Sequence, residues 1–346
     1  MTDDNSQGNV TELHTSSKRI GWIDAAKGLG ILLMIMGHTP IDSKFLYYIY
    51  SFHMPLFFIL GGITFSIKKD FKSFVWHKFK SLLIPYAFFA CCLILFYYSL
   101  KLIFHSRYDP VQDAISFVLQ DHHTYLWFLV TLFVCEILAY VVIKCIHNKL
   151  IKYETIALII TTVLLITFHY FTVTQGWINL VWTLDLVPVS LAFVLTGVLY
   201  RKHGGAAGQT KSAKYIGLLF LISLGISTLN FVFNGRVDMF MSQFDYYPLF
   251  VTGALAGAYF LLVFARRITA PQWLTYIGVY SLVYYGLHKF VIDISLLICD
   301  GIGVPYNLSS WSGVILALIN VVLACILIYP ACSFINRRCP WILGKW

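Results

Sequence analysis

Long apolar runs dominate this chain, and short polar stretches separate them. The runs cover residues 22–39, 45–67, 82–104, 124–147, 153–171, 178–200, 213–234, 246–265, 273–298 and 311–335. Most of them reach the roughly 20 residues that an α-helix needs to cross a bilayer. The pattern predicts an all-α, polytopic membrane protein with ten transmembrane helices. The run 178–200 is the weakest of the ten because it contains Asp185 and Pro188.

The basic residues of the connections test this count and give a direction. With the N-terminus in the cytoplasm, most of the 25 Lys and Arg residues fall in cytoplasmic connections. The outer connections then hold only Lys44, Lys101, Arg107 and Arg236. Cytoplasmic loops of membrane proteins carry such an excess of Lys and Arg. The charges therefore predict that the N-terminus and the C-terminus are both cytoplasmic.

Composition fits this class and narrows the partners. Only 12% of the 346 residues are charged, against about 25% in soluble domains. The net charge of +9 therefore reports topology, and we expect no nucleic-acid partner. The eight cysteines show no metal-ligand spacing and fit core packing, so no metal site is expected. Residues 1–17 form a polar tail, predicted to be disordered, before a membrane domain over 18–346.

The first apolar run carries Asp24, Lys27 and His38. An ionisable side chain within a membrane helix is costly, so it usually has a function. Lys27 and His38 are separated by about three helical turns, or about 16 Å, along nearly one face. That face would present a cation near the inner surface and an imidazole near the outer surface. Alternatively, Lys27 snorkels to the inner surface beside Asp24, and His38 is an interfacial residue at the helix end.

Further polar residues flank the same helices. His53 lies in the outer part of the second run, where it would share a polar pocket with His38 or be an unrelated interface residue. A lysine-rich segment follows that run and would bind phosphates or acidic lipid headgroups. Its lysines are Lys68, Lys69, Lys72, Lys78 and Lys80.

The later helices add candidates at the predicted outer side. Trp127 begins the fourth helix, where it would be a residue of the aromatic belt or a platform for a sugar ring. Tyr285 and His288 lie in the ninth helix at a depth similar to that of His38. His288 would contribute to a pocket or to an interhelical hydrogen bond.

Two charged residues need partners inside the bundle. Lys289 has Asp293 one turn further along the helix, which is the right spacing for an ion pair. Glu136, in the middle of the fourth helix, would balance Lys27 or another buried cation. The segment Gly253–Gly257 has the small residues of a helix-packing face.

Six short motifs then occur in a fixed order along the chain. They are Asp24-x-x-Lys27-Gly, the spacing of ten residues before His38, Phe52-His-Met-Pro-Leu-Phe-Phe, the basic segment leading into Leu-Leu-Ile-Pro85-Tyr86, Leu126-Trp-Phe-Leu and Tyr284-Tyr-Gly-Leu-His288. Each motif is short, but the ordered set is specific. The chain resembles the acyltransferase-3 family of integral membrane O-acyltransferases, and within it the fucose 4-O-acetylase-like branch, over about residues 19–335.

The resemblance implies a function and a location. Such an enzyme moves an acetyl group from cytosolic acetyl-CoA, its co-substrate, to a hydroxyl of a cell-surface saccharide. The acceptor would be a polysaccharide, a lipopolysaccharide or a glycan precursor. The enzyme would be a multi-pass protein of the bacterial cytoplasmic membrane, and no tightly bound cofactor is expected.

The resemblance also implies roles for single residues. His38 matches the essential catalytic histidine, and Lys27 matches the basic residue linked to the donor. The expected donor site comprises Lys27, Asp24, Lys78 and Lys80, and the expected acceptor pocket comprises His53, Trp127, Tyr285 and His288. The chain departs from the family where an R-x-x-R pattern corresponds to Lys78 and Ser81, so that Lys80 would replace the second basic residue. It departs again at Gly61-Gly62, where the family usually has Ser-Gly.

The residues leave the mechanism and the rival functions open. Histidine titrates near neutral pH, so His38 would deprotonate the acceptor hydroxyl or carry the acetyl group as a nucleophile. One rival is a transporter or flippase for a glycan or acyl carrier, with Lys27 and His38 as coupling groups. Another is an acyltransferase with an amine or lipid acceptor. The acceptor, the length of the acyl group and the oligomeric state do not follow from the sequence.

Overall fold

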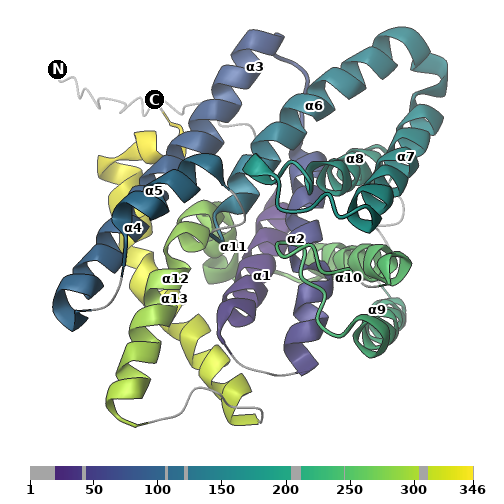
Figure 1. The fold of residues 1–346 in the computed structure, drawn as a ribbon. Helices are drawn as coiled ribbons and strands as arrows, with labels where there is room; N and C mark the ends of the chain where they lie inside the picture. The colour runs from purple at the N-terminus through teal and green to yellow at the C-terminus, as the bar shows by residue number, and fades with distance from the viewer. Residues whose placement is uncertain are drawn as a thin grey trace, which may run out of the picture.

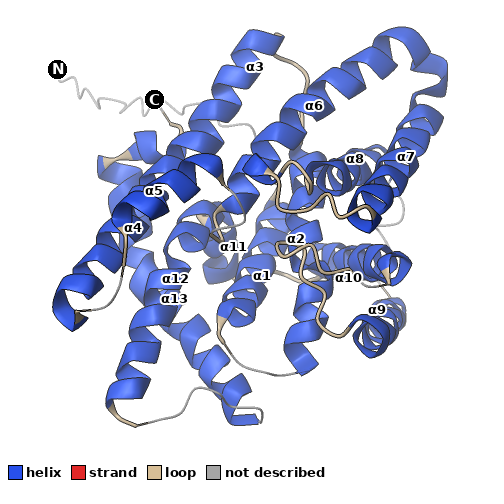
Figure 2. Cartoon of the chain, viewed as in Figure 1, coloured by secondary structure: helices blue, strands red, loops and turns tan. Residues whose placement is uncertain are grey.

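The computed structural model describes residues 20–40, 44–105, 108–120, 124–203, 212–244, 246–303 and 311–345. Within these ranges the chain is a bundle of helices, and its only β-type pairing is an isolated bridge between Asp238 and Gln243 (Figure 2). Nine of the described helices are long and apolar enough to cross a membrane. The all-α class is therefore confirmed. The predicted polar tail, residues 1–17, lies outside the described residues.

The helices follow one another with short connections (Figure 1). In chain order they are α1 (Gly21–His38), α2 (Lys44–Thr64), α3 (Phe71–Lys78), α4 (Ile84–Phe104), α5 (Pro110–Leu119), α6 (Trp127–Leu150), α7 (Glu154–Thr174), α8 (Val187–His203), α9 (Ala213–Asn234), α10 (Tyr247–Arg267), α11 (Gln272–Val279), α12 (Ser281–Gly301) and α13 (Trp311–Arg338).

The predicted runs correspond closely to these helices. The bounds of α9 are those of the predicted run 213–234. Every predicted run except 22–39 has a counterpart among the nine candidate spans. The remaining run forms α1, whose Asp24 and Lys27 make it less apolar than the others. The total of ten spans and the cytoplasmic placement of both termini stay predictions.

The lysine-rich segment after α2 is mostly helical and is not a loop. Asp70 caps α3 by accepting a hydrogen bond from the Ser73 N–H at 3.0 Å. A π-helical turn, Phe79–Leu83, then joins α3 to α4 without a break. Lys72, Lys78 and Lys80 therefore lie on a helical extension of α4, whereas Lys68 and Lys69 precede it.

The predicted helix 273–298 is also wrong as a single element, because it breaks at Tyr280 into α11 and α12. No proline occurs at this point, so the packing of the segment against α1 causes the break. A Cβ added to Gly278 would lie 1.8 Å from the Asp24 carbonyl oxygen, and one added to Gly28 would lie 2.3 Å from that of Leu274. The backbones of α1 and α11 thus pack in direct contact, and α12 starts in a new direction beside α1.

A further helix, α5, lies within the connection between α4 and α6. Asp109 caps it by accepting hydrogen bonds from the N–H groups of Val111 and Gln112. Tyr86, near the start of α4, donates a hydrogen bond to the Phe117 carbonyl near the end of α5. The helix α5 therefore runs back along α4 before the chain enters α6.

The end of α1 lies level with the middle of α2. The Tyr50 hydroxyl donates to the Gly37 carbonyl at 3.1 Å, which places the end of α1 well beyond the first residue of α2. At 1.5 Å per residue, His53 lies about 13 Å from one end of α2 and about 16 Å from the other. Figure 1 shows α2 extending past α1. His38 therefore lies at the end of α1 and beside the middle of α2, and its depth in the membrane stays a prediction.

Small residues hold α2 in place. A Cβ on Gly62 would lie 1.9 Å from the Val194 carbonyl oxygen, and one on Gly197 would lie 2.0 Å from that of Ile59. The backbones of α2 and α8 can approach this closely only because both residues are glycine. Gly257 of α10 packs against the Phe52 ring in the same way. The helix that carries His53 is thus fixed on two sides.

Candidate active site

A cavity of about 210 Å³ lies between α1, α2, α6 and α12, and we call it the Lys27 cavity. Its wall is mostly apolar and includes Ile31, Met34, Met54, Phe57, Leu60, Leu82, Phe128, Leu129, Leu132 and Leu282. Its polar lining comes from Lys27, Thr64, Glu136, Ser281 and Tyr285. An apolar cavity with charged groups at one end suits a long, thin ligand with a charged terminus.

An ion pair borders this cavity. The Lys78 ammonium lies 2.8 Å from Glu136, whose residue is only 3% exposed. Because Lys27 lines the same cavity, two cations and one carboxylate share this end of the bundle. The prediction that a buried cation balances Glu136 is confirmed, and that cation is Lys78.

The other two predicted donor residues lie apart from the cavity wall. Asp24 is half-buried, and its backbone packs against Gly278 of α11. The Lys80 ammonium lies 5.7 Å from the centre of the Trp76 ring, on the outward side of the α3 extension. The structure therefore brings Lys27 and Lys78 together but does not place Asp24 or Lys80 on the wall.

A second cavity, of about 230 Å³, contains His38, and we call it the His38 cavity. Its other lining residues are Tyr50, His53, Met54, Tyr125, Trp127, Arg236, Asp238, Met239, Phe240 and Met241. Met54 lines both cavities. The two cavities are therefore neighbours on opposite sides of one side chain.

Three imidazoles are held in the same way by their own helices. Nδ1 lies 2.8 Å from the Met34 carbonyl oxygen in His38, 3.0 Å from that of Ile49 in His53, and 2.7 Å from that of Tyr285 in His288. A carbonyl oxygen only accepts, so Nδ1 carries the proton in each neutral ring. Nε2 is then left as the basic nitrogen, which is the form that a general base or nucleophile requires.

His288 lies directly against His38. Their ring centres are 4.8 Å apart, and the centre of the Tyr125 ring lies 4.8 Å from that of His288 and 6.2 Å from that of His38. His288 is fully buried, and its Nε2 has no hydrogen-bond partner among the described residues. Tyr285 lines the Lys27 cavity, and its hydroxyl donates to the Tyr125 carbonyl. The segment Tyr285–His288 thus connects the two cavities.

The neighbouring ion pair of α12 also follows the prediction. The Lys289 ammonium donates to the Asp293 carboxylate one turn away, and Tyr97 donates to the same carboxylate at 2.8 Å. These contacts give the Lys289 ammonium a counter-charge on its own helix. The pair is therefore structural support for α12 at this level.

Trp127 does not lie in an aromatic belt at the lipid surface. Its residue is only 3% exposed, and its ring stacks on Phe240 with 5.9 Å between the ring centres. Both rings line the His38 cavity. Burial beside His38 disagrees with the aromatic-belt interpretation of Trp127. It is compatible with the interpretation of Trp127 as a residue of a pocket.

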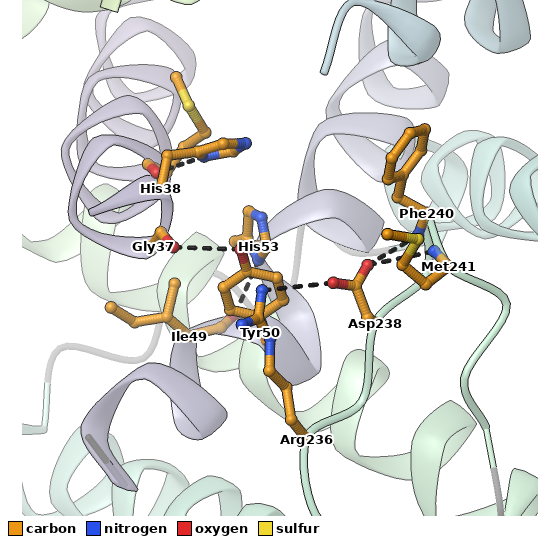
Figure 3. A network of polar contacts seen from close by, with 10 residues as sticks. Gly37, His38, Ile49, Tyr50, His53, Arg236, Asp238, Phe240 and Met241 are labelled. Carbon is orange, nitrogen blue, oxygen red and sulfur yellow. Dashed lines mark hydrogen bonds and ion pairs between the residues drawn. The ribbon is translucent and has the colours of Figure 1, made fainter. Parts of the chain in front are cut away.

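The connection between α9 and α10 supplies residues that the sequence analysis missed. The Arg236 guanidinium lies 3.9 Å from the centre of the Tyr50 ring and donates to Asp238 at 3.3 Å (Figure 3). Asp238 also accepts from the N–H groups of Phe240 and Met241 at 3.0 and 3.3 Å. Burial raises the pKa of Asp238 above its usual range, although Arg236 opposes the shift. The only sequence signal was the Arg-Val-Asp spacing.

Comparison with known families completes the description. The model of the acyltransferase-3 family, described as an acyltransferase domain, matches residues 20–330. The chain belongs to the acyltransferase-3 family. Comparisons with curated proteins and with solved structures find no match. The matched range contains both cavities and all nine candidate spans apart from the end of α13, so the protein is a multi-pass membrane acyltransferase.

In this acyltransferase the two cavities offer the parts that acyl transfer needs. The His38 ring is oriented by the Met34 carbonyl, and one shared side chain separates it from the apolar Lys27 cavity. No group of three His, Cys, Asp or Glu side chains within the described ranges is arranged to hold a metal ion.

Proposed function

We propose that this acyltransferase moves an acetyl group from cytosolic acetyl-CoA to a hydroxyl of a cell-surface saccharide. The enzyme would be of the fucose 4-O-acetylase-like branch, in a bacterial cytoplasmic membrane. The observation that carries the proposal is the pair of cavities that meet at Met54. The Lys27 cavity has cations at its end. The His38 cavity is lined by His38 and His53, and His288 packs against His38.

The Lys27 cavity suits the donor. Its apolar wall matches a thin pantetheine arm, and Lys27 and Lys78 lie where the phosphates of CoA would reach the bundle. Ammonium groups are strong partners for phosphate oxygens. Glu136 holds Lys78 in position until a phosphate competes for it. This end of the bundle faces the cytoplasm in the topology that the basic residues favour.

His38 would carry the chemistry at the junction. As a general base, its Nε2 takes the proton from the acceptor hydroxyl while the hydroxyl oxygen attacks the thioester carbonyl. The C–S bond breaks, the acetyl group is left on the oxygen, and CoA leaves as the thiolate. In the two-step route, Nε2 attacks the carbonyl first, the C–S bond breaks and CoA leaves as the thiolate. The acceptor oxygen then attacks the acetyl group, the N–C bond to the ring breaks, and the hydroxyl proton passes to the CoA thiolate.

Sealed vesicles containing the purified enzyme test the function and its direction together. Because acetyl-CoA does not cross a bilayer, it is added on one side only, and free CoA and acetylated saccharide are measured. We expect both products only when the donor is on the Lys27 side and a saccharide is present. Lys27→Met should raise the KM for acetyl-CoA about tenfold, since a charge-assisted hydrogen bond contributes about 1.5 kcal/mol or more, and Lys27→Arg should be milder.

The alternatives predict different products in the same vesicles. A transporter or flippase would release no CoA. An acyltransferase with an amine or lipid acceptor would release CoA and yield an acetylated amine or lipid, with saccharides having no effect. Either result contradicts the proposed function.

A further inference from the structure

The connection between α9 and α10 is built as a fixed wall of the His38 cavity. Asn234 and Tyr246 close its base, because the Asn234 amide donates to the Tyr246 carbonyl at 3.2 Å and accepts from its N–H. Asp185 accepts from the Ser242 hydroxyl at 3.2 Å. The side chains of Val237, Met239 and Phe244 are at most 4% exposed. We call Gly235–Phe244 the wall segment.

One part of this wall is aromatic. Phe240 of the wall segment stacks on Trp127, with an angle of 28° between the rings, and both line the cavity that contains His38. The C–H face of a sugar ring is apolar and loses its contact with water when it packs on aromatic rings. The stack therefore offers a platform for one face of a saccharide within the cavity of the imidazoles.

The other part of the wall is polar and electrically balanced. Arg236 and Asp238 form an ion pair and both line the cavity. A guanidinium has five N–H donors, and a carboxylate only accepts. Arg236 can therefore donate to one hydroxyl of a ligand while Asp238 accepts from a neighbouring hydroxyl. No other residue that lines this cavity carries a formal charge when its histidines are neutral. An anionic acceptor would need an unbalanced cation here.

The pair also reaches the end of α1. Arg236 covers the ring of Tyr50, whose hydroxyl bonds the Gly37 carbonyl beside His38 (Figure 3). A saccharide held by Arg236 would thus lie in the cavity that His38 lines. This arrangement links recognition of the acceptor to the position of the base.

We propose that the wall segment determines acceptor specificity and selects an uncharged sugar ring. One face of the ring packs on Trp127 and Phe240, and its hydroxyls bond Arg236 and Asp238. This inference rests on the proposed function and deepens it. It assigns acceptor binding to residues on a connection that carries none of the motifs of the first helices.

A matched pair of acceptors tests the proposal in vesicles. Methyl glucoside and methyl glucuronide differ only at C6, where one has a hydroxymethyl group and the other a carboxylate. We expect the glucoside to have a kcat/KM at least tenfold higher. Asp238→Asn leaves Arg236 without its counter-charge, so it should lower kcat/KM for the glucoside and raise it for the glucuronide. A merely structural role of Asp238 would lower both.

The aromatic platform is tested separately. Phe240→Leu should raise the KM for the saccharide about tenfold and leave the KM for acetyl-CoA unchanged. The matched control is Phe168→Leu on α7, where the ring is 54% exposed and lies far from either cavity lining. Equal changes in both KM values, a wild-type preference for the glucuronide, or an unchanged preference in Asp238→Asn would each overturn the proposal.

A binding measurement separates this proposal from the proposed function. Saturation-transfer NMR detects the two glycosides on the enzyme without any acetyl-CoA. If no acetyl group is transferred but the glucoside binds and Phe240→Leu weakens that binding, the proposed function fails and the specificity of the wall segment stands. If neither glycoside binds, the proposal is wrong.

Discussion

The Lys27 cavity and the His38 cavity have similar volumes, about 210 and 230 Å³, but they are built from different parts of the chain. Regular helices supply almost the whole wall of the Lys27 cavity. The wall segment supplies about half of the residues that line the His38 cavity. Connections vary more readily than helices and often carry specificity. A site built from rigid helices suits a ligand that is the same for many enzymes. A site walled by a connection suits a ligand that differs from one enzyme to the next.

The largest expected effect concerns the reactive group of the His38 cavity. His38→Ala should lower acetyl transfer about 10²–10⁴-fold, the range for loss of a general base, and His38→Gln should fail as well because an amide cannot titrate. The measurement is turnover per folded protein, with folding followed by size-exclusion chromatography. His169→Gln is the matched control, since this buried histidine bonds Tyr247 and lines neither cavity.

Near-normal turnover in His38→Gln would mean that His38 is structural. The chemistry would then have to move to His53 or His288. An acetyl group that hydroxylamine removes from His38 would favour the two-step route. Consumption of acetyl-CoA only in the presence of an acceptor would favour direct attack.

The second effect concerns the ion pair of the Lys27 cavity. Glu136→Gln leaves Lys78 partly buried without a counter-charge, so it should lower the free energy of unfolding by about 3 kcal/mol. The control is Glu154→Gln, which breaks an ion pair of the same length, 2.8 Å, whose Lys202 side chain is 37% exposed. Exposed pairs contribute about 1 kcal/mol or less. Both variants are unfolded by denaturant in detergent. Equal losses of the free energy of unfolding in Glu136→Gln and Glu154→Gln would show that burial of the Glu136 ion pair is unimportant.

The smallest effect concerns the side chain that the cavities share. Met54→Ala should enlarge the junction and shift the preference from acetyl-CoA toward longer acyl donors. Each added CH₂ contributes about 0.8 kcal/mol when it is buried, which is about fourfold in relative kcat/KM. Competition between acetyl-CoA and butyryl-CoA gives the ratio. Met36→Ala, on the neighbouring helix α1 and outside both linings, should leave the ratio unchanged.

Much of the fold follows from the sequence because a bilayer imposes one length on every spanning helix. That constraint gives the bounds of α9 and the counterpart of each predicted run. It says nothing about α5, whose path depends on contacts such as the hydrogen bond from Tyr86 to Phe117. Nor does it predict the break at Tyr280, which follows from the packing of Gly278 on Asp24.

The candidate site divides in the same way. Helical spacing along one element predicted the ion pair of Lys289 and Asp293, and the cost of a buried carboxylate predicted a partner for Glu136. Arg236 and Asp238 could not be predicted, because only the tertiary fold brings the wall segment to Tyr50 and His38. The position of His38 beside the middle of α2 could not be predicted, because the sequence does not say how far α2 extends past the end of α1.

That early end of α1 has an electrical consequence. In the proposed function the two cavities are reached from opposite sides of the membrane, and they would form a leak for protons if they joined. Moving one charge through 100 mV is worth about 2.3 kcal/mol, so such a leak would drain the membrane potential. Apolar Met34, Met54 and Phe128 line the Lys27 cavity between its charges and the imidazoles. Under the proposed function, such a bundle passes a neutral acetyl group from the donor side to the acceptor side and keeps the membrane insulated.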